Sequence, residues 1–221
     1  MLTTNIVRDQ EICLEEIIDN KQIVAIYQNH SEWGPRALGN RSILFDPRNP
    51  NAKNIVNSVK KREAYRPFAC TIMAEHAHDY FEMLQLPDSP WMSFAIQCKE
   101  KAHKDIPSLV HADNTCRMQT VTEEQNKNYY NLIKGFYEKT GVPILFNTSF
   151  NLGGEAIVEN IFDAIDTCNR SMINFLYIPE DQDYAIPYDC IRDKSDVPYF
   201  KEKEYKDLEP LKFPEKEDFL K

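Results

Sequence analysis

The chain has 221 residues, of which 42% are hydrophobic and 11% aromatic, a size and composition that suit one α/β domain with a real core. Its formal net charge of −9 argues against a general nucleic-acid binder and against a protein held on an anionic membrane. No apolar run approaches the roughly 20 residues that a membrane helix needs, and residues 1–10 contain no signal-peptide core. The six cysteines include no Cys-x-x-Cys pair, which argues against a zinc knuckle and predicts reduced thiols in a cytoplasmic protein.

The spacing of apolar residues and turn residues predicts alternating helices and strands. In chain order these are a helix over 10–20, strands over 23–27 and 42–45, a helix over 51–61, strands over 68–73, 93–98 and 117–121, a helix over 126–139, a strand over 143–146, a helix over 160–170 and a strand over 174–178. This order predicts an α/β fold with a mixed, twisted sheet and flanking helices. We assign residues 1–187 to this domain. Residues 188–221, dense in Lys, Asp and Glu, are predicted to form a peripheral or disordered tail.

Positive charge is concentrated in one segment of this acidic chain. Residues 34–68 contain eight cations and two acids. Such a cluster repels itself unless an anion or distant carboxylates neutralise it, and the fork of an arginine suits phosphate oxygens. The alternative is a solvated basic helix face, which fits Lys53 and Lys61 better. Three arginines stand among glycine, proline and apolar neighbours and are interpreted as ligand-binding residues: Arg36, Arg41 and Arg66.

A second candidate segment follows the predicted strand over 143–146. Residues 147–155 combine small hydrogen-bonding side chains with two of the six glycines of the chain. Loops at strand ends are where α/β proteins hold ligands, so Ser149 and Asn151 are candidates for contacts with phosphate or ribose oxygens. An ordinary Asx-rich turn is the alternative. Because the sequence contains no P-loop pattern, any ATP would be bound by another architecture.

A third segment, residues 111–120, places a histidine, an aspartate and an arginine at the entry to a predicted strand. This grouping makes the segment a third candidate for ligand contacts. A single histidine or arginine in a loop is more often structural or solvated, and that alternative stays open here.

The motifs in these segments are long and specific. They are the stretches at 31–44, 60–68, 111–121 and 146–155, of which the first contains Gly-Pro-Arg-Ala-Leu-Gly at 34–39 and the second ends in Arg-Pro-Phe at 66–68. Together, and in this order, they resemble the C-terminal region of the O-carbamoyltransferases of the nodulation-factor, cephamycin and tobramycin type. The resemblance spans residues 11–179 and implies a YrdC-like fold. Such folds carry a Lys-x-Arg and Ser-x-Asn signature, which is matched here at 60–62 and 149–151.

This resemblance implies a reaction and a site. In that family the YrdC-like domain binds ATP, Mg²⁺ and carbamoyl phosphate, and it makes carbamoyl-adenylate with release of phosphate and pyrophosphate. By resemblance the catalytic contacts are assigned to Lys60, Arg66 and Arg117. The residues assigned to binding of substrate and nucleotide are Arg36, Arg41, Arg62, His111, Asn147, Ser149 and Asn151. We identify no protein ligand for a metal ion.

The chain departs from the family pattern in two places. Asn29-His30 stands where the family commonly has a Gly-Arg pair. In the family, an N-terminal domain with a metal site passes the carbamoyl group to a hydroxyl acceptor, and these residues do not match it. We expect either that a partner protein supplies this domain or that the chain is the product of a half-gene with partial activity. A docking surface is expected near residues 29–33, with Trp33 as its anchor. Alternatively, Trp33 packs beneath the arginines.

Two other functions remain open at this point. One is a non-catalytic YrdC-like module that binds a nucleotide or RNA, although the net negative charge of the chain disfavours RNA. The other is a threonylcarbamoyl-adenylate synthase, which shares the fold. The motifs at 34–39 and 66–68 favour the carbamoyltransferase branch. The acceptor of the carbamoyl group and the oligomeric state do not follow from the sequence.

Overall fold

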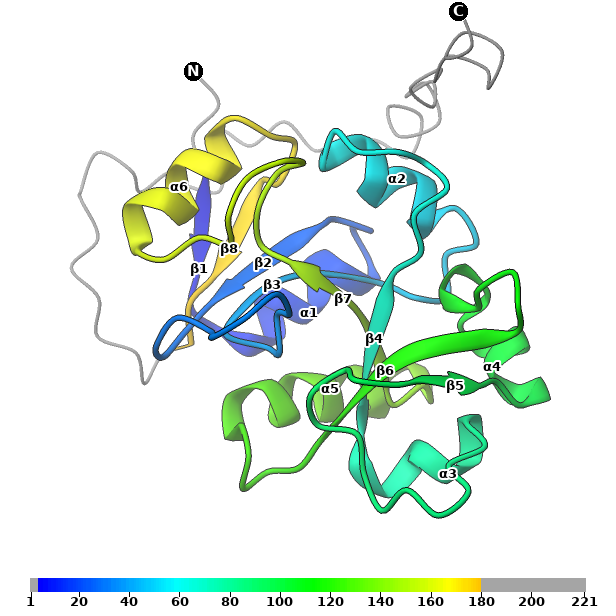
Figure 1. The fold of residues 1–221 in the computed structure, drawn as a ribbon. Coiled ribbons are helices and arrows are strands. Elements are labelled where there is room, and N and C mark those ends of the chain that lie inside the picture. Colours follow the sequence, from blue (N-terminus) through cyan, green and yellow to red (C-terminus); the bar gives the residue numbers. More distant parts are fainter. Residues whose placement is uncertain (1–3, 180–221) are drawn as a thin grey trace, which may run out of the picture.

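One mixed sheet of eight strands organises the computed structural model, which describes residues 4–179. The strand order is β1-β8-β2-β3-β7-β4-β6-β5. In that order the strands are Asn5–Val7, Phe175–Tyr177, Val24–Tyr27, Arg41–Phe45, Ile144–Ser149, Ala69–Met73, Thr115–Val121 and Ala95–Gln97. Three pairs, β1–β8, β8–β2 and β4–β6, are parallel, and the other pairs are antiparallel. The sheet twists strongly from β1 to β5 (Figure 1).

The helices flank this sheet. They are α1 Gln10–Ile18, α2 Ala52–Val59, α3 Ala77–Tyr80, α4 Glu100–Asp105, α5 Lys127–Thr140 and α6 Ile161–Asn169, with short 3₁₀ turns at Ala74–His76 and Pro107–Leu109. Figure 1 shows α1 and α5 behind the sheet, where they also contact each other. The side chain of Asn126 caps the start of α5, and Gly141 ends that helix in a left-handed conformation. None of the helices in residues 4–179 combines the length and apolar character needed to cross a bilayer.

Every helix and strand predicted from periodicity is present, with small shifts at the ends. The sequence analysis missed β1 and the short helices that follow β4 and β5. A strand of three residues is too short to show a period, and α4 has one buried residue, Ala102, so it carries no apolar stripe. The five described cysteines are buried and free. The predicted tail over 188–221 lies outside the described residues.

One face of the middle of the sheet carries a row of polar side chains, and Tyr129 of α5 reaches it by donating to Thr71 Oγ1 at 2.9 Å. Arg117 of β6 and Asn147 of β7 are both paired with Ala69 of β4, so the three residues lie side by side across the sheet. Side chains two residues apart on a strand point to the same face, which adds Gln119 and Ser149 to this row. The middle of the sheet therefore has a hydrogen-bonding face instead of an apolar one.

Buried hydrogen bonds join this polar face to the loop over 29–40. The Asn147 side-chain amide donates to Thr71 Oγ1 at 2.8 Å and to the carbonyl of Ala37 at 3.2 Å. Gln119 Nε2 donates to the carbonyl of Leu38 at 2.9 Å. Because these groups are buried, losing one partner would leave another unsatisfied, and the network holds the loop in one position over the sheet.

Candidate functional site

The loop over 29–40 is built around the carboxylate of Glu32. Its Oε1 accepts from the backbone N–H groups of Leu38 at 2.6 Å and Asn40 at 3.0 Å, and its Oε2 accepts from that of Arg41 at 3.2 Å. Burial raises the pKa of Glu32, and the three backbone donors oppose that shift. Sequence analysis assigned Glu32 no role of its own. It positions Arg36 by folding the segment on both sides of that residue.

Lys60, at the end of α2, directly contacts residues 149–151, the Ser-x-Asn motif, which we call the serine–asparagine segment. Its ammonium donates to the Ser149 carbonyl, to Asn151 Oδ1 at 2.9 Å and to Ser149 Oγ at 3.3 Å. The Lys60 side chain is buried, and that burial, with repulsion from Arg62, lowers its pKa to about 7. The Lys-x-Arg and Ser-x-Asn motifs, far apart in the sequence, thus form one site.

Gly153 allows the two motifs to come this close. Its N–H donates to the carbonyl of Lys60 at 2.7 Å. A Cβ atom at this position would lie 2.8 Å from the carbonyl oxygen of Lys61, closer than real side chains approach a backbone. The serine–asparagine segment is therefore fastened to the end of α2 by its backbone as well as by the lysine.

Arg62 and Arg66 extend the positive charge from Lys60. Arg62 Nε donates to Asn57 Oδ1 at 2.7 Å, and its guanidinium lies 4.2 Å from the centroid of the Phe68 ring. Burial lowers the pKa of Arg62 to about 10, and repulsion from Arg66 contributes. Arg66 is exposed and pairs with Glu63 at 2.8 Å. The buried Asn57, which sequence analysis missed, also donates to the carbonyl of Arg66 and so shapes this turn.

Arg117 and Arg36 complete the group of charges. Burial lowers the pKa of Arg117, and repulsion from Arg36 adds to that shift. Arg117 in turn repels Arg62, which connects the two halves of the group. The Nε atom of Arg117 is buried and has no hydrogen-bond partner among the described residues. We call these five residues the cation cluster: Arg36, Lys60, Arg62, Arg66 and Arg117.

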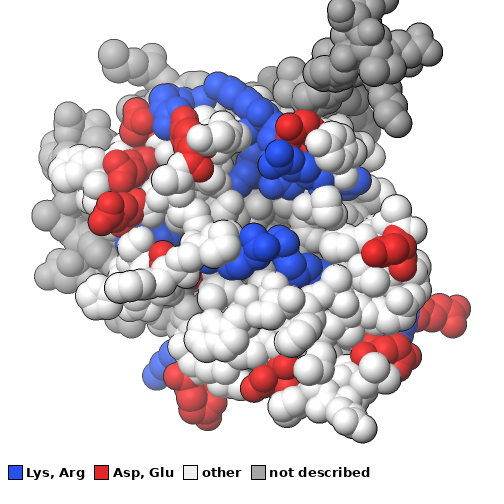
Figure 2. Space-filling view, viewed as in Figure 1, with Lys and Arg blue, Asp and Glu red and all other residues white. Residues whose placement is uncertain are grey.

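Figure 2 shows the surface of the domain in the view of Figure 1. Positive side chains lie along and above a hollow across its centre, while most acidic side chains lie nearer its edges. The acid paired with a member of the cluster, among residues 4–179, is Glu63. Asp46, the other acid of the basic segment, pairs with Arg48 at 2.7 Å. The cluster therefore retains an excess of positive charge in the folded domain.

Of the five predicted binding residues outside this cluster, Ser149 and Asn151 contact Lys60, and the other three bind elsewhere. Arg41 is buried, stacks on Tyr27 at 3.7 Å, and donates to backbone carbonyls that include those of Gln28 at 2.5 Å and Glu159 at 3.2 Å. Asn147 is buried in the network beneath the loop. The ring of His111 contacts the Phe68 carbonyl at 2.9 Å through Nε2. In this structure each of the three contacts at least one backbone carbonyl group.

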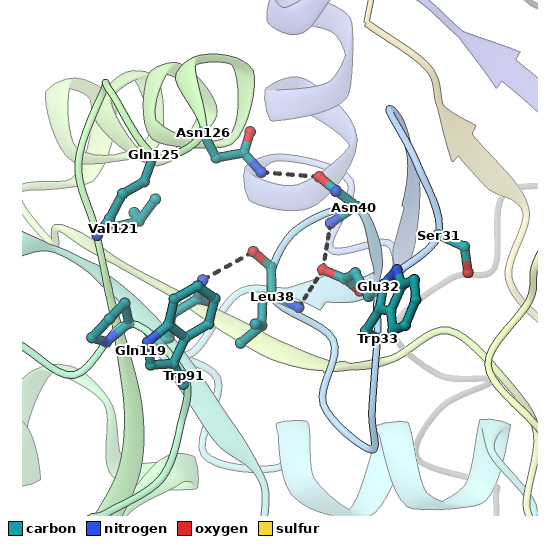
Figure 3. Close-up of a pocket in the computed structure, with 11 residues that line it drawn as sticks. Ser31, Glu32, Trp33, Leu38, Asn40, Trp91, Gln119, Val121, Gln125 and Asn126 are labelled. Carbon is teal, nitrogen blue, oxygen red and sulfur yellow. Dashed lines mark hydrogen bonds between the residues drawn. The ribbon is translucent and has the colours of Figure 1, made fainter.

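A cavity of about 530 Å³ lies beside the loop over 29–40. It is lined by Ser31, Glu32, Trp33, Leu38, Asn40, Pro90, Trp91, Gln119, Val121, Gln125 and Asn126 (Figure 3). The Trp33 side chain is 99% exposed, so the alternative that it packs beneath the arginines is wrong. Within residues 4–179, no group of three or more histidine, cysteine or acidic side chains is placed to hold a metal ion.

Two solved structures resemble this fold. Full-length HypF "in the phosphate- and nucleotide-bound form" matches with a TM-score of 0.51 at 20% identity, over 80% of this chain and 25% of that one. The H234A/Y235A variant of Sua5 from P. abyssi matches with a TM-score of 0.51 at 14% identity, over 82% of this chain and 51% of that one. These similarities confirm the predicted YrdC-like fold.

The sequence comparisons identify the family. Nodulation protein NolNO of Sinorhizobium fredii is 45% identical over 157 residues, which cover 69% of this chain and 23% of that protein. Nodulation protein NolO of Bradyrhizobium diazoefficiens is 44% identical over 153 residues, 67% of this chain and 27% of that protein. The chain thus spans about a quarter of the length of these relatives. The model of the carbamoyltransferase C-terminus matches residues 15–182, and the chain belongs to that family.

Proposed function

We propose that this domain binds ATP and carbamoyl phosphate and joins them into carbamoyl-adenylate, the activated form of the carbamoyl group used to modify a hydroxyl acceptor. The observation that carries the proposal is the cation cluster. Lys60 and Arg62 are held close enough to each other, and to further arginines, that repulsion adds to burial in lowering their pKa values. Charges arranged in this way destabilise the empty domain and are relieved by an anion.

The geometry supports a division of roles within the cluster. Lys60, Ser149 and Asn151 already form one hydrogen-bonded unit, so we assign them to the phosphates of ATP. Arg117 has a buried donor without a partner in residues 4–179, and Arg36 lies near enough to repel it, so we assign both to carbamoyl phosphate. Arg62 repels both Lys60 and Arg117, so it connects these two groups, and Arg66 repels Arg62. Bidentate arginine contacts suit the phosphate oxygens of both ligands.

The proposed reaction has two balanced steps. Water first cleaves carbamoyl phosphate to carbamate and phosphate. A carbamate oxygen then attacks the α-phosphorus of ATP, forming a new P–O bond, and the bond to the β-phosphate breaks to release pyrophosphate. The residues of the cluster accelerate both steps by holding two polyanions together and by stabilising the charge that builds on the α-phosphate.

Mg²⁺ fits this proposal as a companion of ATP and not as a resident ion. The described residues offer no carboxylate cluster, and Mg²⁺ in nucleotide sites commonly keeps several waters and binds through the phosphates of the substrate. When bound, the ion would neutralise part of the phosphate charge. The chain's own contribution is the set of cations around it.

The comparisons support the proposal at a coarser level. Membership of the carbamoyltransferase C-terminal family supports a transferase. The HypF structure, of which this chain matches 25%, is described as a phosphate- and nucleotide-bound form, and the proposal is in keeping with that description. Because the nodulation relatives are about four times longer than the matched segment, we further propose that a separate acceptor domain or partner protein receives the adenylate.

Pyrophosphate release distinguishes this proposal from the two alternatives. With ATP and Mg²⁺, we expect release that depends on carbamoyl phosphate, and we expect none with threonine and bicarbonate. A threonylcarbamoyl-adenylate synthase would show the opposite dependence, and a binding module would release no pyrophosphate with either. When sugars are added as hydroxyl acceptors, slow formation of AMP without a carbamoylated sugar is expected. Efficient carbamoylation of the sugar by this chain alone would contradict the proposed need for another domain.

A further inference from the structure

The loop over 29–40 is fastened on both sides of its tip. On one side, the Glu32 carboxylate binds the backbone N–H groups of residues 38, 40 and 41. On the other side, Asn147 donates to the carbonyl of Ala37, and Gln119 donates to that of Leu38. We call the four residues between these anchors the tip of the loop: Trp33, Gly34, Pro35 and Arg36.

The tip makes little contact with the rest of the described domain. Trp33 is 99% exposed at the edge of the cavity shown in Figure 3, and Gly34 and Pro35 are exposed as well. Among residues 4–179, the tip forms one hydrogen bond, from Arg36 to the carbonyl of its own neighbour Pro35 at 3.3 Å. A Cβ atom on Gly34 would meet nothing within 4 Å. The tip therefore has room to move while its two anchors stay in place.

The backbone of the tip has one soft joint. Gly34 has a φ of +90°, and a glycine moves between positive and negative φ with little steric cost. The ring of Pro35 fixes the φ of the next residue at about −65°, so that residue is stiff. Rotation about Gly34 therefore changes the position of Trp33 relative to Arg36.

The charge of Arg36 connects the tip to the cation cluster. Arg36 repels Arg117 and contributes to lowering the pKa of that guanidinium. The buried Nε atom of Arg117 has no hydrogen-bond partner within the described part of the chain. A phosphate group between the two arginines replaces their repulsion by attraction to a shared anion, because guanidinium groups bind phosphate oxygens strongly. Filling the site thus also draws the tip towards it.

We propose that the tip is a flap that closes over the cation cluster when a phosphate group binds between Arg36 and Arg117. The inference rests on the proposed function, because it takes carbamoyl phosphate as that ligand. In the closed form the indole of Trp33 lies over the ligand and separates it from bulk water. The first proposed step consumes one water molecule, whereas further water would hydrolyse the adenylate, so closure protects the product of the site.

The fluorescence of Trp33 tests this movement. Trp91→Phe leaves Trp33 as the sole tryptophan of the chain, and Trp33→Phe leaves Trp91 alone as the matched control. Carbamoyl phosphate contains no ring that would stack on an indole. We expect it to shift the emission of Trp33 to shorter wavelength and to protect Trp33 from quenching by acrylamide. The emission of Trp91 should stay the same.

Arg36→Met tests whether the anion draws the tip inward. We expect this variant to bind carbamoyl phosphate more weakly by roughly 10- to 150-fold, the effect of losing a charge-assisted contact. At saturating ligand, its Trp33 should show neither the shift nor the protection. Lys53→Met removes a cation of α2 that lies outside the cluster, and it should leave the affinity and the response of Trp33 unchanged. Calorimetry measures the affinities.

Two failures of this experiment are distinguishable. If carbamoyl phosphate binds and Trp33 does not respond, or if Arg36→Met responds as the wild-type chain does, the flap is wrong while the phosphate site stands. If carbamoyl phosphate does not bind at all, the proposed function fails and the flap fails with it. Should a tryptophan variant not fold, fluorine NMR of the wild-type chain containing 5-fluorotryptophan makes the same comparison, because its two indoles give separate signals.

Discussion

Lys60→Met is expected to abolish pyrophosphate release and to weaken ATP binding by roughly 10- to 150-fold, the effect of losing one or more charge-assisted hydrogen bonds. The substitution removes the donor that joins α2 to Ser149 and Asn151, and it removes the buried charge of the cluster. Its effect on the empty domain is expected to be small at neutral pH. Lost hydrogen bonds destabilise the variant, but it no longer buries an ammonium group close to Arg62.

The pH dependence of stability separates a functional lysine from a merely structural one. The pKa of Lys60 is about 7 in the folded domain and near 10.5 when unfolded, so between these values the unfolded chain binds more protons. The lysine's contribution to the free energy of unfolding therefore rises as the pH rises from about 7 towards 10.5. Lys60→Met should remove this rise. ATP binding should favour the charged lysine, and so take up protons and weaken above about pH 7.

Lys61→Met is the matched control, because Lys61 is the exposed neighbour of Lys60 and lies outside the cluster. We expect nearly normal binding, turnover and pH dependence from it. Thermal melts and calorimetry in buffers of different ionisation enthalpy provide the measurements. A Lys60→Met variant that melts far below the wild-type chain and binds ATP normally would show that Lys60 supports the fold alone.

Gly39→Ala is expected to destabilise the domain by roughly 3 kcal/mol or more, the largest effect on stability among the substitutions considered. The backbone of Gly39 has a φ of +111°, which side chains rarely adopt, and a Cβ atom would lie 2.2 Å from Cδ1 of the buried Tyr129 ring. Strained backbone and overpacking each cost about 1–3 kcal/mol. The loop that carries Arg36 would have to move, so ligand binding should fall as well.

Gly34→Ala separates the effect of backbone strain from the effect of overpacking. Gly34 also has a positive φ, +90°, but a Cβ atom there would meet nothing within 4 Å. Backbone strain alone should then lower stability by about 1 kcal/mol. Denaturant unfolding of the two variants measures the difference. Equal losses of stability in both would mean that the contact between Gly39 and Tyr129 is unimportant.

Sequence periodicity predicts most of the helices and strands, but it does not predict the shortest elements or the order of the strands. Helix α5 has an apolar stripe, an asparagine cap and a terminal glycine, so both its helical structure and its ends were predictable. Strand β1 pairs with β8, from the other end of the described chain. Its formation depends on that distant partner, and three residues carry no periodic signal of their own. The order of the strands, which brings β3 beside β7 and β4 beside β6, likewise depends on tertiary pairing.

The residue types of the candidate site were easier to predict from the sequence than the contacts that each residue makes. Arg36 and Arg41 stand in the same motif among similar neighbours, yet the first faces the cluster and the second is buried against Tyr27. The alternation of side chains along a strand distinguishes Arg41 from Arg36 only when the start of β3 is known, because Arg41 is the first residue of that strand. Glu32 and Asn57 were missed because their role is to bind backbone N–H and carbonyl groups. An acid or amide flanked by motif residues is the available signal for such a role.

Calorimetry at low salt tests most directly whether the cation cluster holds ATP and carbamoyl phosphate. The wild-type chain is titrated with each ligand up to millimolar concentration, ATP being added with Mg²⁺. We expect both to bind, ATP with uptake of protons above about pH 7, and both to bind more weakly as salt screens the cluster. The absence of binding by either ligand under these conditions would contradict the assignment of the cluster to phosphate groups.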